Sequence, residues 1–273
     1  MAVNLTLGAV FGSELLGTAL LIVLGTGVVA NVLLKGSKGF DGGWLLINVG
    51  WGFGVLAGVY AAFKSGGHLN PAVTVGILVS GADEYAPGVP VGAASTLAYV
   101  SGQFAGAFLG ACATYVAYKN HFDAEADDNK KLWVFSTAPQ IRNYGWNFLT
   151  EVIATFVLVM VVLSLGHTPN TPGPIAAALL VVGIGASLGG PTGYAINPAR
   201  DLGPRIAHAL LVAPRRVTVP IGAAGTAASS SEVLTAAEPV RGRASSDWAY
   251  SWVPVAGPLV GAVLAGLLAP VVL

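Results

Sequence analysis

The sequence alternates between long apolar stretches and shorter polar ones. A helix needs about 20 mostly apolar residues to cross the hydrocarbon core of a bilayer. Segments close to this length occur at 9–33, 44–63, 95–118, 147–166, 174–190 and 250–272. The pattern therefore predicts an all-α membrane protein with six transmembrane helices, in which lipid is the main surrounding partner.

Composition supports the same class. Hydrophobic residues make up 54% of the chain and charged residues 10%, whereas soluble domains carry about 25% charged residues. This disfavours the alternative of a soluble protein with a very large core. The formal net charge of zero argues against nucleic acid as a partner, and Cys112 is the single cysteine, so neither an internal disulfide nor a cysteine cluster for a metal can form. We expect no metal and no cofactor.

Similar segments recur in the same order in the two parts of the chain. A glutamate-containing apolar segment, an Asn-Pro-Ala triplet and a glycine-rich segment appear in each part. The pairs are 13–25 with 150–162, 70–72 with 197–199, and 102–111 with 257–266. We interpret 1–273 as a single channel domain built from halves 9–118 and 147–272. Each half holds three spans, so the second half enters the membrane upside down and the repeat is inverted.

One segment falls outside this repeat. The second half carries extra residues after its Asn-Pro-Ala triplet, within 214–243. The segment is rich in Ala, Ser, Gly and Thr and has no strong period, so we predict a flexible loop.

Each Asn-Pro-Ala triplet is typical of a helix start. Asparagine is a preferred N-cap and proline is favoured at the first helical position. The helices that would follow Asn70 and Asn197 are too short to cross a bilayer, so we predict two re-entrant half-helices. In an inverted repeat their N-termini would meet near the midplane. The alternative is that both triplets simply break helices.

The asparagines and the residues before them suggest a polar path. Each asparagine can cap its helix through the side-chain oxygen while its NH2 group remains a donor. The extended backbone before each triplet would present carbonyl acceptors. We expect these from Gly66, Gly67, His68, Gly193 and Ala195. Paired donors between two rows of acceptors suit a small, neutral, hydrogen-bonding solute.

Four charged residues accompany the motifs. Arg200 would be a charge at membrane depth, which normally marks a solute pathway. Asp201 follows it and could hold the arginine or its loop in place. We expect Glu14 and Glu151 to accept hydrogen bonds from loop backbone NH groups rather than to move protons. The alternative for Arg200 and Asp201 is a surface ion pair.

At this point the chain resembles the aquaporin, or major intrinsic protein, family, and specifically its glycerol-facilitator branch. The motifs "GHLNPAVT" and "NPARDLGPR" carry the resemblance, which covers nearly the whole chain except 214–243. It implies an aquaporin-like fold of six tilted helices and two half-helices, assembled as a homotetramer with one pore in each subunit.

The resemblance also implies a selectivity filter. In the family this filter combines the arginine of the second motif, here Arg200, with three wall positions, which here fall on Trp51, Gly185 and Tyr194. Water-selective relatives have a histidine where Gly185 stands. Five positions that usually separate the branches fall on Tyr118, Asp201, Arg205, Pro254 and Val255, of which only Val255 departs from the glycerol-type residue.

The charge distribution opposes the topology that the resemblance implies. Lys and Arg favour the cytoplasm, and they gather after the first and third spans and before the sixth. This would place both termini outside. The family places both termini in the cytoplasm, and we adopt that orientation in a cell membrane.

These features predict a passive channel for glycerol and related small neutral polyols that also passes water and excludes protons and ions. The alternative within the class is a mainly water-selective aquaporin. An ion- or proton-coupled transporter is compatible with inverted repeats, and a junction protein with a closed pore is a further alternative. We expect no enzyme activity, because no nucleophile–base set appears.

Overall fold

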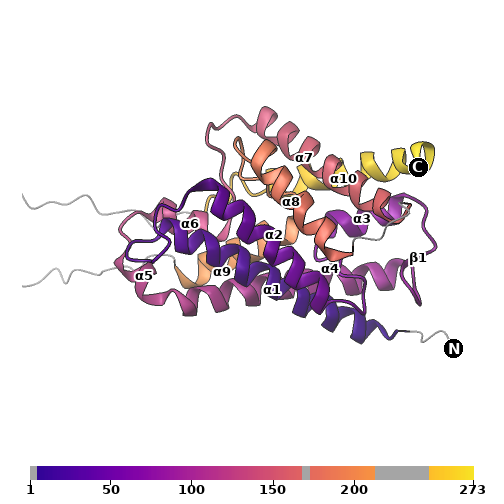
Figure 1. Cartoon of the computed structure of the whole chain (residues 1–273), viewed down its shortest axis with the longest axis horizontal. Coiled ribbons are helices and arrows are strands. Elements are labelled where there is room, and N and C mark those ends of the chain that lie inside the picture. Colours follow the sequence, from indigo (N-terminus) through magenta and orange to yellow (C-terminus); the bar gives the residue numbers. More distant parts are fainter. Residues whose placement is uncertain (1–4, 168–172, 213–245) are drawn as a thin grey trace, which may run out of the picture.

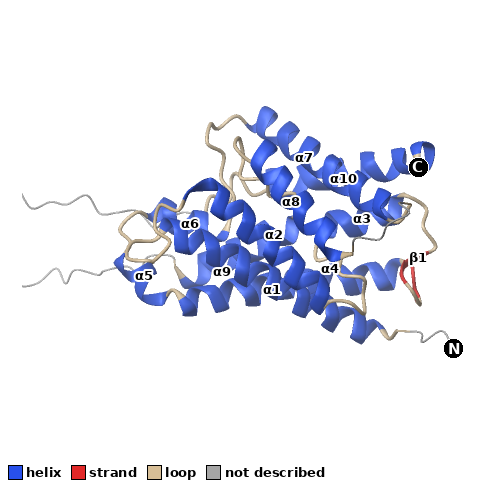
Figure 2. Ribbon diagram, viewed as in Figure 1, coloured by secondary structure: helices blue, strands red, loops and turns tan. Residues whose placement is uncertain are grey.

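The computed structural model describes residues 5–167, 173–212 and 246–273. Regular structure in these residues is almost entirely helical, with one short hairpin (Figure 2). The helices are α1 (Leu7–Leu33), α2 (Gly43–Ala61), α3 (Pro71–Val79), α4 (Ala93–Ala117), α5 (Lys119–Ala124), α6 (Asp128–Phe135), α7 (Tyr144–Leu165), α8 (Pro174–Leu188), α9 (Pro198–Leu211) and α10 (Val253–Val272). Strands β1 (Glu84–Ala86) and β2 (Val89–Pro90) pair antiparallel.

The six predicted spans correspond to α1, α2, α4, α7, α8 and α10. Among the described residues, five of these helices are long and apolar enough to cross a membrane. The remaining one, α8, has 15 residues and ends before the pair Gly189 and Gly190. It is shorter than the predicted segment 174–190, because glycine and the following Pro191 disfavour continuation of the helix.

The two half-helices lie in the middle of the helical bundle. α3 has nine residues and α9 has 14. α9 extends from the centre toward the left end of Figure 1, whereas α3 extends toward the right end. Their N-termini therefore face each other at the centre, as the sequence predicts.

Glycine allows very close helix packing at equivalent places. A Cβ atom added to Gly106 of α4 would lie 2.3 Å from the carbonyl oxygen of Leu15 in α1. One added to Gly261 of α10 would lie 2.3 Å from the carbonyl oxygen of Val152 in α7. Small residues let membrane helices approach in this way. The glycine-rich segment of each half thus packs on the glutamate-containing helix of the same half. The boundaries of the halves, 9–118 and 147–272, stay a prediction.

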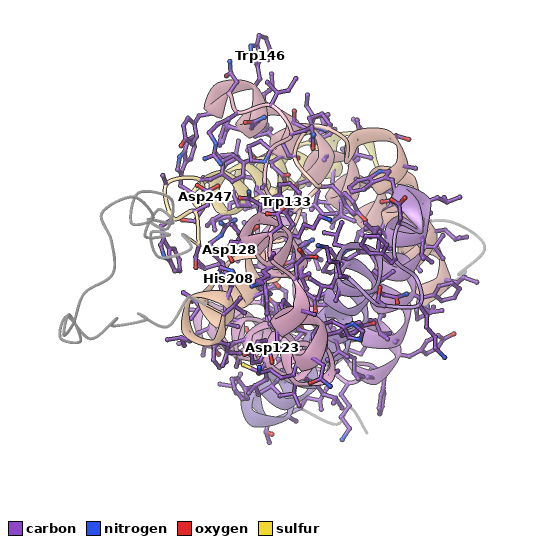
Figure 3. All side chains as sticks on the ribbon, turned by 90° about the vertical axis from the view of Figure 1, so that its left-hand side faces the viewer. Asp123, Asp128, Trp133, Trp146, His208 and Asp247 are labelled. Carbon is purple, nitrogen blue, oxygen red and sulfur yellow. The ribbon has the colours of Figure 1, made fainter. Side chains whose placement is uncertain are left out.

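The two ends of the bundle differ. α5 and α6 lie at the left end of Figure 1, and the hairpin lies at the right end, where α1 begins and α10 ends. A view onto the left end shows Trp133, Trp146 and Asp247 there (Figure 3). The sequence analysis assigned no structure to α5, α6 or the hairpin. The predicted loop 214–243 lies outside the described residues.

Candidate functional site

The two asparagines cap the half-helices. Asn70 Oδ1 accepts a hydrogen bond from the Ala72 NH at 2.8 Å. Asn197 Oδ1 accepts from the Ala199 NH at 3.0 Å and the Arg200 NH at 3.2 Å. Proline follows each asparagine at the first helical position, where its missing NH has no cost. The helix dipoles consequently place two partial positive charges at the centre of the bundle.

Each asparagine also binds the loop that precedes the other one. Asn70 Nδ2 donates to the carbonyl oxygen of Ile196 at 2.8 Å, and Asn197 Nδ2 donates to that of Leu69 at 2.9 Å. The sequence analysis did not anticipate these two reciprocal bonds. An amide NH2 group carries two hydrogens, so each asparagine keeps one donor for a solute.

Two buried carboxylates hold these loops. Glu14 accepts from the His68 NH at 3.0 Å and the Leu69 NH at 2.7 Å. Glu151 accepts from the Ala195 NH at 3.0 Å and the Ile196 NH at 2.9 Å. The side chains of Ser65 and Gln103 also donate to Glu14. The Thr192 hydroxyl donates to Glu151.

The loops need this support because their backbone is strained. Leu69 has φ 55°, Tyr194 φ 39° and Ile196 φ 45°. Such left-handed conformations are unfavourable for side chains of this size and persist only where the surroundings enforce them. Each carboxylate binds the NH of one of these residues and of its neighbour, and thereby fixes the loop backbone that precedes each half-helix.

We expect Glu151→Gln to destabilise the protein. An amide retains one acceptor oxygen, whereas the carboxylate uses both oxygens for three buried donors. The loss should be about 2–4 kcal/mol, because a broken buried network leaves donors unpaired. Thermal unfolding of purified protein in detergent, followed by circular dichroism, measures it. The exposed Glu84 allows a matched control, and Glu84→Gln should leave the melting temperature unchanged. An unchanged melting temperature in Glu151→Gln would contradict this role.

Residues expected to supply pore carbonyls line two cavities. Gly66, Gly67, His68 and Ala195 line a cavity of about 400 Å³, together with both asparagines. Gly193 lines a second cavity of about 260 Å³.

The ring of His68 is fixed on two sides. Its Nδ1 lies 3.1 Å from the Thr74 hydroxyl and its Nε2 lies 3.2 Å from the Tyr85 carbonyl oxygen. The ring also stacks on Tyr99, with centroids 4.2 Å apart. With both nitrogens engaged, this histidine suits an orienting role better than proton transfer.

Three residues belong to both cavities: Trp51, Tyr194 and Arg200. They therefore form the junction between the cavities. The guanidinium carbon of Arg200 lies 4.0 Å from the centroid of the Trp51 ring, a cation–π contact. Arg200 Nη1 also donates to the Phe135 carbonyl oxygen at 3.4 Å. The junction thus places two aromatic residues, Trp51 and Tyr194, beside the cationic Arg200.

Gly185 lies behind this junction, not on its surface. It lines neither cavity, and a Cβ atom there would lie 2.7 Å from Tyr194 Cζ and 2.5 Å from Asn48 Oδ1. The Tyr194 ring fills the space that the missing side chain leaves, so Gly185 would act on the filter through this ring. Its place in the selectivity filter stays a prediction. Trp44, which the sequence analysis missed, contacts Tyr194 edge-on at 5.7 Å and donates to the Gly185 carbonyl at 3.0 Å.

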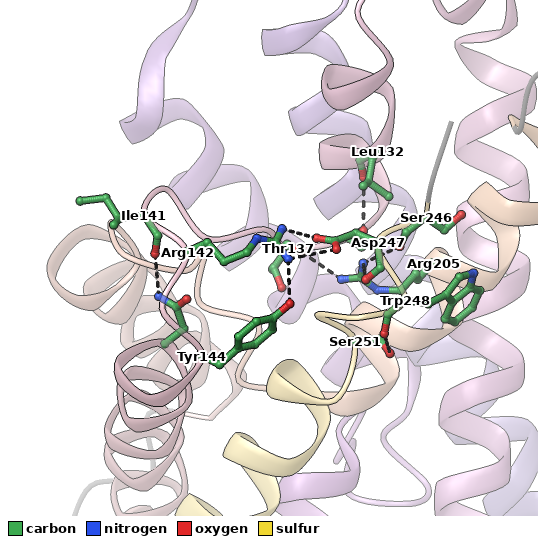
Figure 4. Close-up of polar contacts among 12 residues, drawn as sticks. Leu132, Thr137, Ile141, Arg142, Tyr144, Arg205, Ser246, Asp247, Trp248 and Ser251 are labelled. Carbon is green, nitrogen blue, oxygen red and sulfur yellow. Dashed lines mark hydrogen bonds and ion pairs between the residues drawn. The ribbon is translucent and has the colours of Figure 1, made fainter. Parts of the chain in front are cut away.

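Asp201 holds a loop and another arginine. It accepts from the NH and the hydroxyl of Thr137, both at 2.7 Å, and from Arg205 Nε at 2.8 Å. Arg205 in turn donates to the carbonyls of Thr137 and Ser246 at 3.0 and 2.7 Å (Figure 4). Asp201 and Arg205 are fully buried, so the alternative of a surface ion pair involving Asp201 does not apply. Of the two roles expected for Asp201, its hydrogen bonds to Thr137 fit support of the loop.

An ion pair closes the outer edge of this network. Arg142 Nη2 lies 2.5 Å from Asp247 Oδ2, and its guanidinium also lies over the Tyr250 ring. The hydrogen bond to Asp247 raises the pKa of Arg142. Sequence reasoning missed this pair, since the two residues are far apart in the chain and belong to no repeated motif.

No group of three metal-ligating side chains occurs within residues 5–167, 173–212 and 246–273. The chemistry that the site offers is hydrogen bonding: amide donors, a guanidinium and backbone carbonyls beside apolar walls. Such groups can replace the hydration shell of a small solute step by step.

Comparisons with known proteins give a consistent result. The sequence model described as "Major intrinsic protein" matches residues 4–269. The chain is 45% identical to the probable glycerol uptake facilitator protein of Thermotoga maritima, over 94% of this chain and 96% of that protein. It is 46% identical to glycerol uptake facilitator protein 3 of Lactiplantibacillus plantarum, over 93% of each. The X-ray structure of the aquaglyceroporin from Plasmodium falciparum has a TM-score of 0.74 and 25% sequence identity, covering 98% of this chain and 97% of that one.

Proposed function

The chain belongs to the major intrinsic protein family, and from this premise we propose that it is a passive channel for glycerol and related small neutral polyols. Water passes through the same pore. Protons and ions are excluded. The relatives named as glycerol uptake facilitators, and the likeness to an aquaglyceroporin, support the glycerol assignment.

The junction of Trp51, Tyr194 and Arg200 is the observation that carries this proposal. A polyol has hydroxyl groups along one edge and CH groups along the other. Arg200 supplies donors for the hydroxyls, while the two rings offer apolar surface to the CH groups. Desolvation of the solute is thereby offset at the junction by contacts of matching polarity.

The reciprocal asparagines support exclusion of protons. One donor of Asn70 and one of Asn197 remain after the loop bonds are counted. Both would orient the oxygen of a passing water toward the centre, and the two helix N-termini act in the same sense. Waters oriented in opposite directions on either side cannot relay a proton. The two positive dipole ends also disfavour cations.

The proposed assembly follows the family. It is a homotetramer in a cell membrane, with one pore in each subunit and both termini in the cytoplasm. The beginning of α1 and the end of α10 lie at the same end of the bundle (Figure 1), which is compatible with termini on one side.

Stopped-flow light scattering on proteoliposomes tests the function. We expect rapid swelling with glycerol, slower swelling with longer polyols, and water permeability above that of empty vesicles. Glycerol flux should rise linearly with concentration and require no ion gradient, which would exclude a coupled transporter. Water flux without glycerol flux would instead support a water-selective aquaporin, and no flux of either would support a closed junction protein.

A further inference from the structure

The hydroxyl of Tyr194 is turned away from the solute path. The Tyr194 side chain lines both cavities, yet its oxygen is buried and has no hydrogen-bond partner among the described residues. A buried phenol oxygen normally has a partner. The residue therefore presents an apolar ring to the cavities and places its polar atom behind that ring.

Asn48 provides polar atoms in the same region. It lies on α2 between Trp44 and Trp51, at helical spacings of four and three residues, so all three share one face. Asn48 is 1% exposed and lines neither cavity. Within the described part of the chain, neither its amide nitrogen nor its amide oxygen has a partner. Burial of an unpaired amide is energetically costly. Asn48 does not line either cavity, so contact with the solute does not explain its presence.

The two groups meet at one glycine. The position that a Cβ atom of Gly185 would occupy lies 2.5 Å from Asn48 Oδ1 and 2.7 Å from Tyr194 Cζ. Gly185 thus lies close to both the Asn48 amide and the ring carbon that carries the Tyr194 hydroxyl. One shared water would join the two unpaired groups.

We propose that Asn48 is a positioning residue that binds the Tyr194 hydroxyl and keeps it out of the solute path. By this bond it preserves the apolar face that Tyr194 presents to the CH groups of a polyol. The inference rests on the proposed function, because it concerns how the same junction distinguishes glycerol from water. Asn48 acts through Tyr194 and does not touch the solute.

Asn48→Leu is the primary test, since leucine keeps the branching of asparagine at Cγ and has no polar atoms. The Tyr194 hydroxyl then loses its partner and turns toward the hydrated cavity, which makes the junction more polar. We expect the ratio of glycerol to water permeability to fall about threefold to tenfold, the range that corresponds to one net hydrogen bond. Water permeability itself should not fall.

The control is a double-mutant cycle with Tyr194→Phe, which removes the hydroxyl and keeps the ring. The ratio measured for Tyr194→Phe is the reference of the cycle, because this variant has no hydroxyl that Asn48 could bind. The Asn48→Leu/Tyr194→Phe variant should return to the Tyr194→Phe ratio, since no hydroxyl remains to be released. Asn48→Ala provides a second removal of the amide if Asn48→Leu fails to purify as a folded protein.

Two results would overturn the inference. One is an Asn48 variant with an unchanged ratio. The other is a loss of selectivity that persists undiminished in the Tyr194→Phe background, which would indicate a packing role for Asn48. Failure of the proposed function is distinguishable, because the wild-type protein would then conduct no glycerol. In that case the water permeabilities of the four proteins still test the coupling between Asn48 and Tyr194.

Discussion

Asn197→Asp should reduce glycerol permeability by at least about tenfold, because leaving one buried group without its partner costs about 1–3 kcal/mol. Aspartate keeps an oxygen that can cap α9. It loses the NH2 group that donates to the Leu69 carbonyl and to the solute. A carboxylate oxygen would then face the carbonyl oxygen of Leu69 and repel it. The loop that carries this carbonyl should move, and the central donor disappears.

Stopped-flow light scattering on purified Asn197→Asp in liposomes measures this loss. Asn129→Asp is a matched control, because Asn129 is exposed on α6 and lines neither cavity. Asn70→Asp should behave like Asn197→Asp, since Asn70 makes the equivalent bond to Ile196. Normal glycerol flux through well-folded Asn197→Asp would count against a solute path between the motifs.

Gly185→His should abolish most glycerol flux and should also reduce water flux. The new Cβ atom would lie 2.7 Å from Tyr194 Cζ, so the ring must move. It cannot retreat along α8, because the Cβ position of Gly189 already lies 2.4 Å from Tyr194 Cδ1, and Trp44 packs against the ring edge. The free direction is the junction of the two cavities. A ring displaced into the junction obstructs the path of glycerol, so we expect at least about a tenfold loss of glycerol permeability, which corresponds to about 1.4 kcal/mol in the barrier to permeation.

A second substitution separates this effect from misfolding. In Gly185→His/Tyr194→Ala, removal of the ring leaves room for the imidazole, and water permeability should recover above that of Gly185→His alone. Circular dichroism and size-exclusion chromatography establish that each variant is folded. Wild-type glycerol permeability in Gly185→His would show that the ring does not move into the junction. The interpretation that Gly185 leaves space for the Tyr194 ring would then be wrong.

This result differs from what the family resemblance alone suggests. With Gly185 on the pore wall, histidine would narrow the opening for glycerol and leave water flux largely intact. The structure places the glycine behind an aromatic ring, so the same substitution acts on Tyr194 first.

The helices were predictable because apolar runs of membrane length leave few alternatives. Predicted and observed helix ends differ most at α7, predicted from 147 and observed from Tyr144, and at α10, predicted from 250 and observed from Val253. The half-helices were predictable for a local reason, since the capping asparagine and the following proline define a helix start. Short elements such as α6 leave no such signal, because their position depends on packing against the bundle.

Within the site, sequence reasoning identified residues but not their partners. Both asparagines, both glutamates and Arg200 belong to motifs and were found. Trp44 contacts Tyr194, and the Phe135 carbonyl binds Arg200. Thr137 binds the neighbouring Asp201. All three partners come from segments without a repeated pattern. Such contacts depend on how the chain folds in three dimensions. The orientation of Gly185 was missed for the same reason, because the ring that covers it comes from a loop nine residues later.

The reciprocal bonds between the asparagines and the opposite loops have a kinetic consequence. In transporters built from inverted repeats, one half rocks against the other so that a central site opens to each side in turn. Here Asn70 is bonded to the Ile196 carbonyl and Asn197 to the Leu69 carbonyl. Rocking would break both bonds at the midplane during every cycle. These two bonds therefore favour a rigid pore in which diffusion of the solute is the slow step. Permeability should then be equal in both directions, and the flux should depend only weakly on temperature.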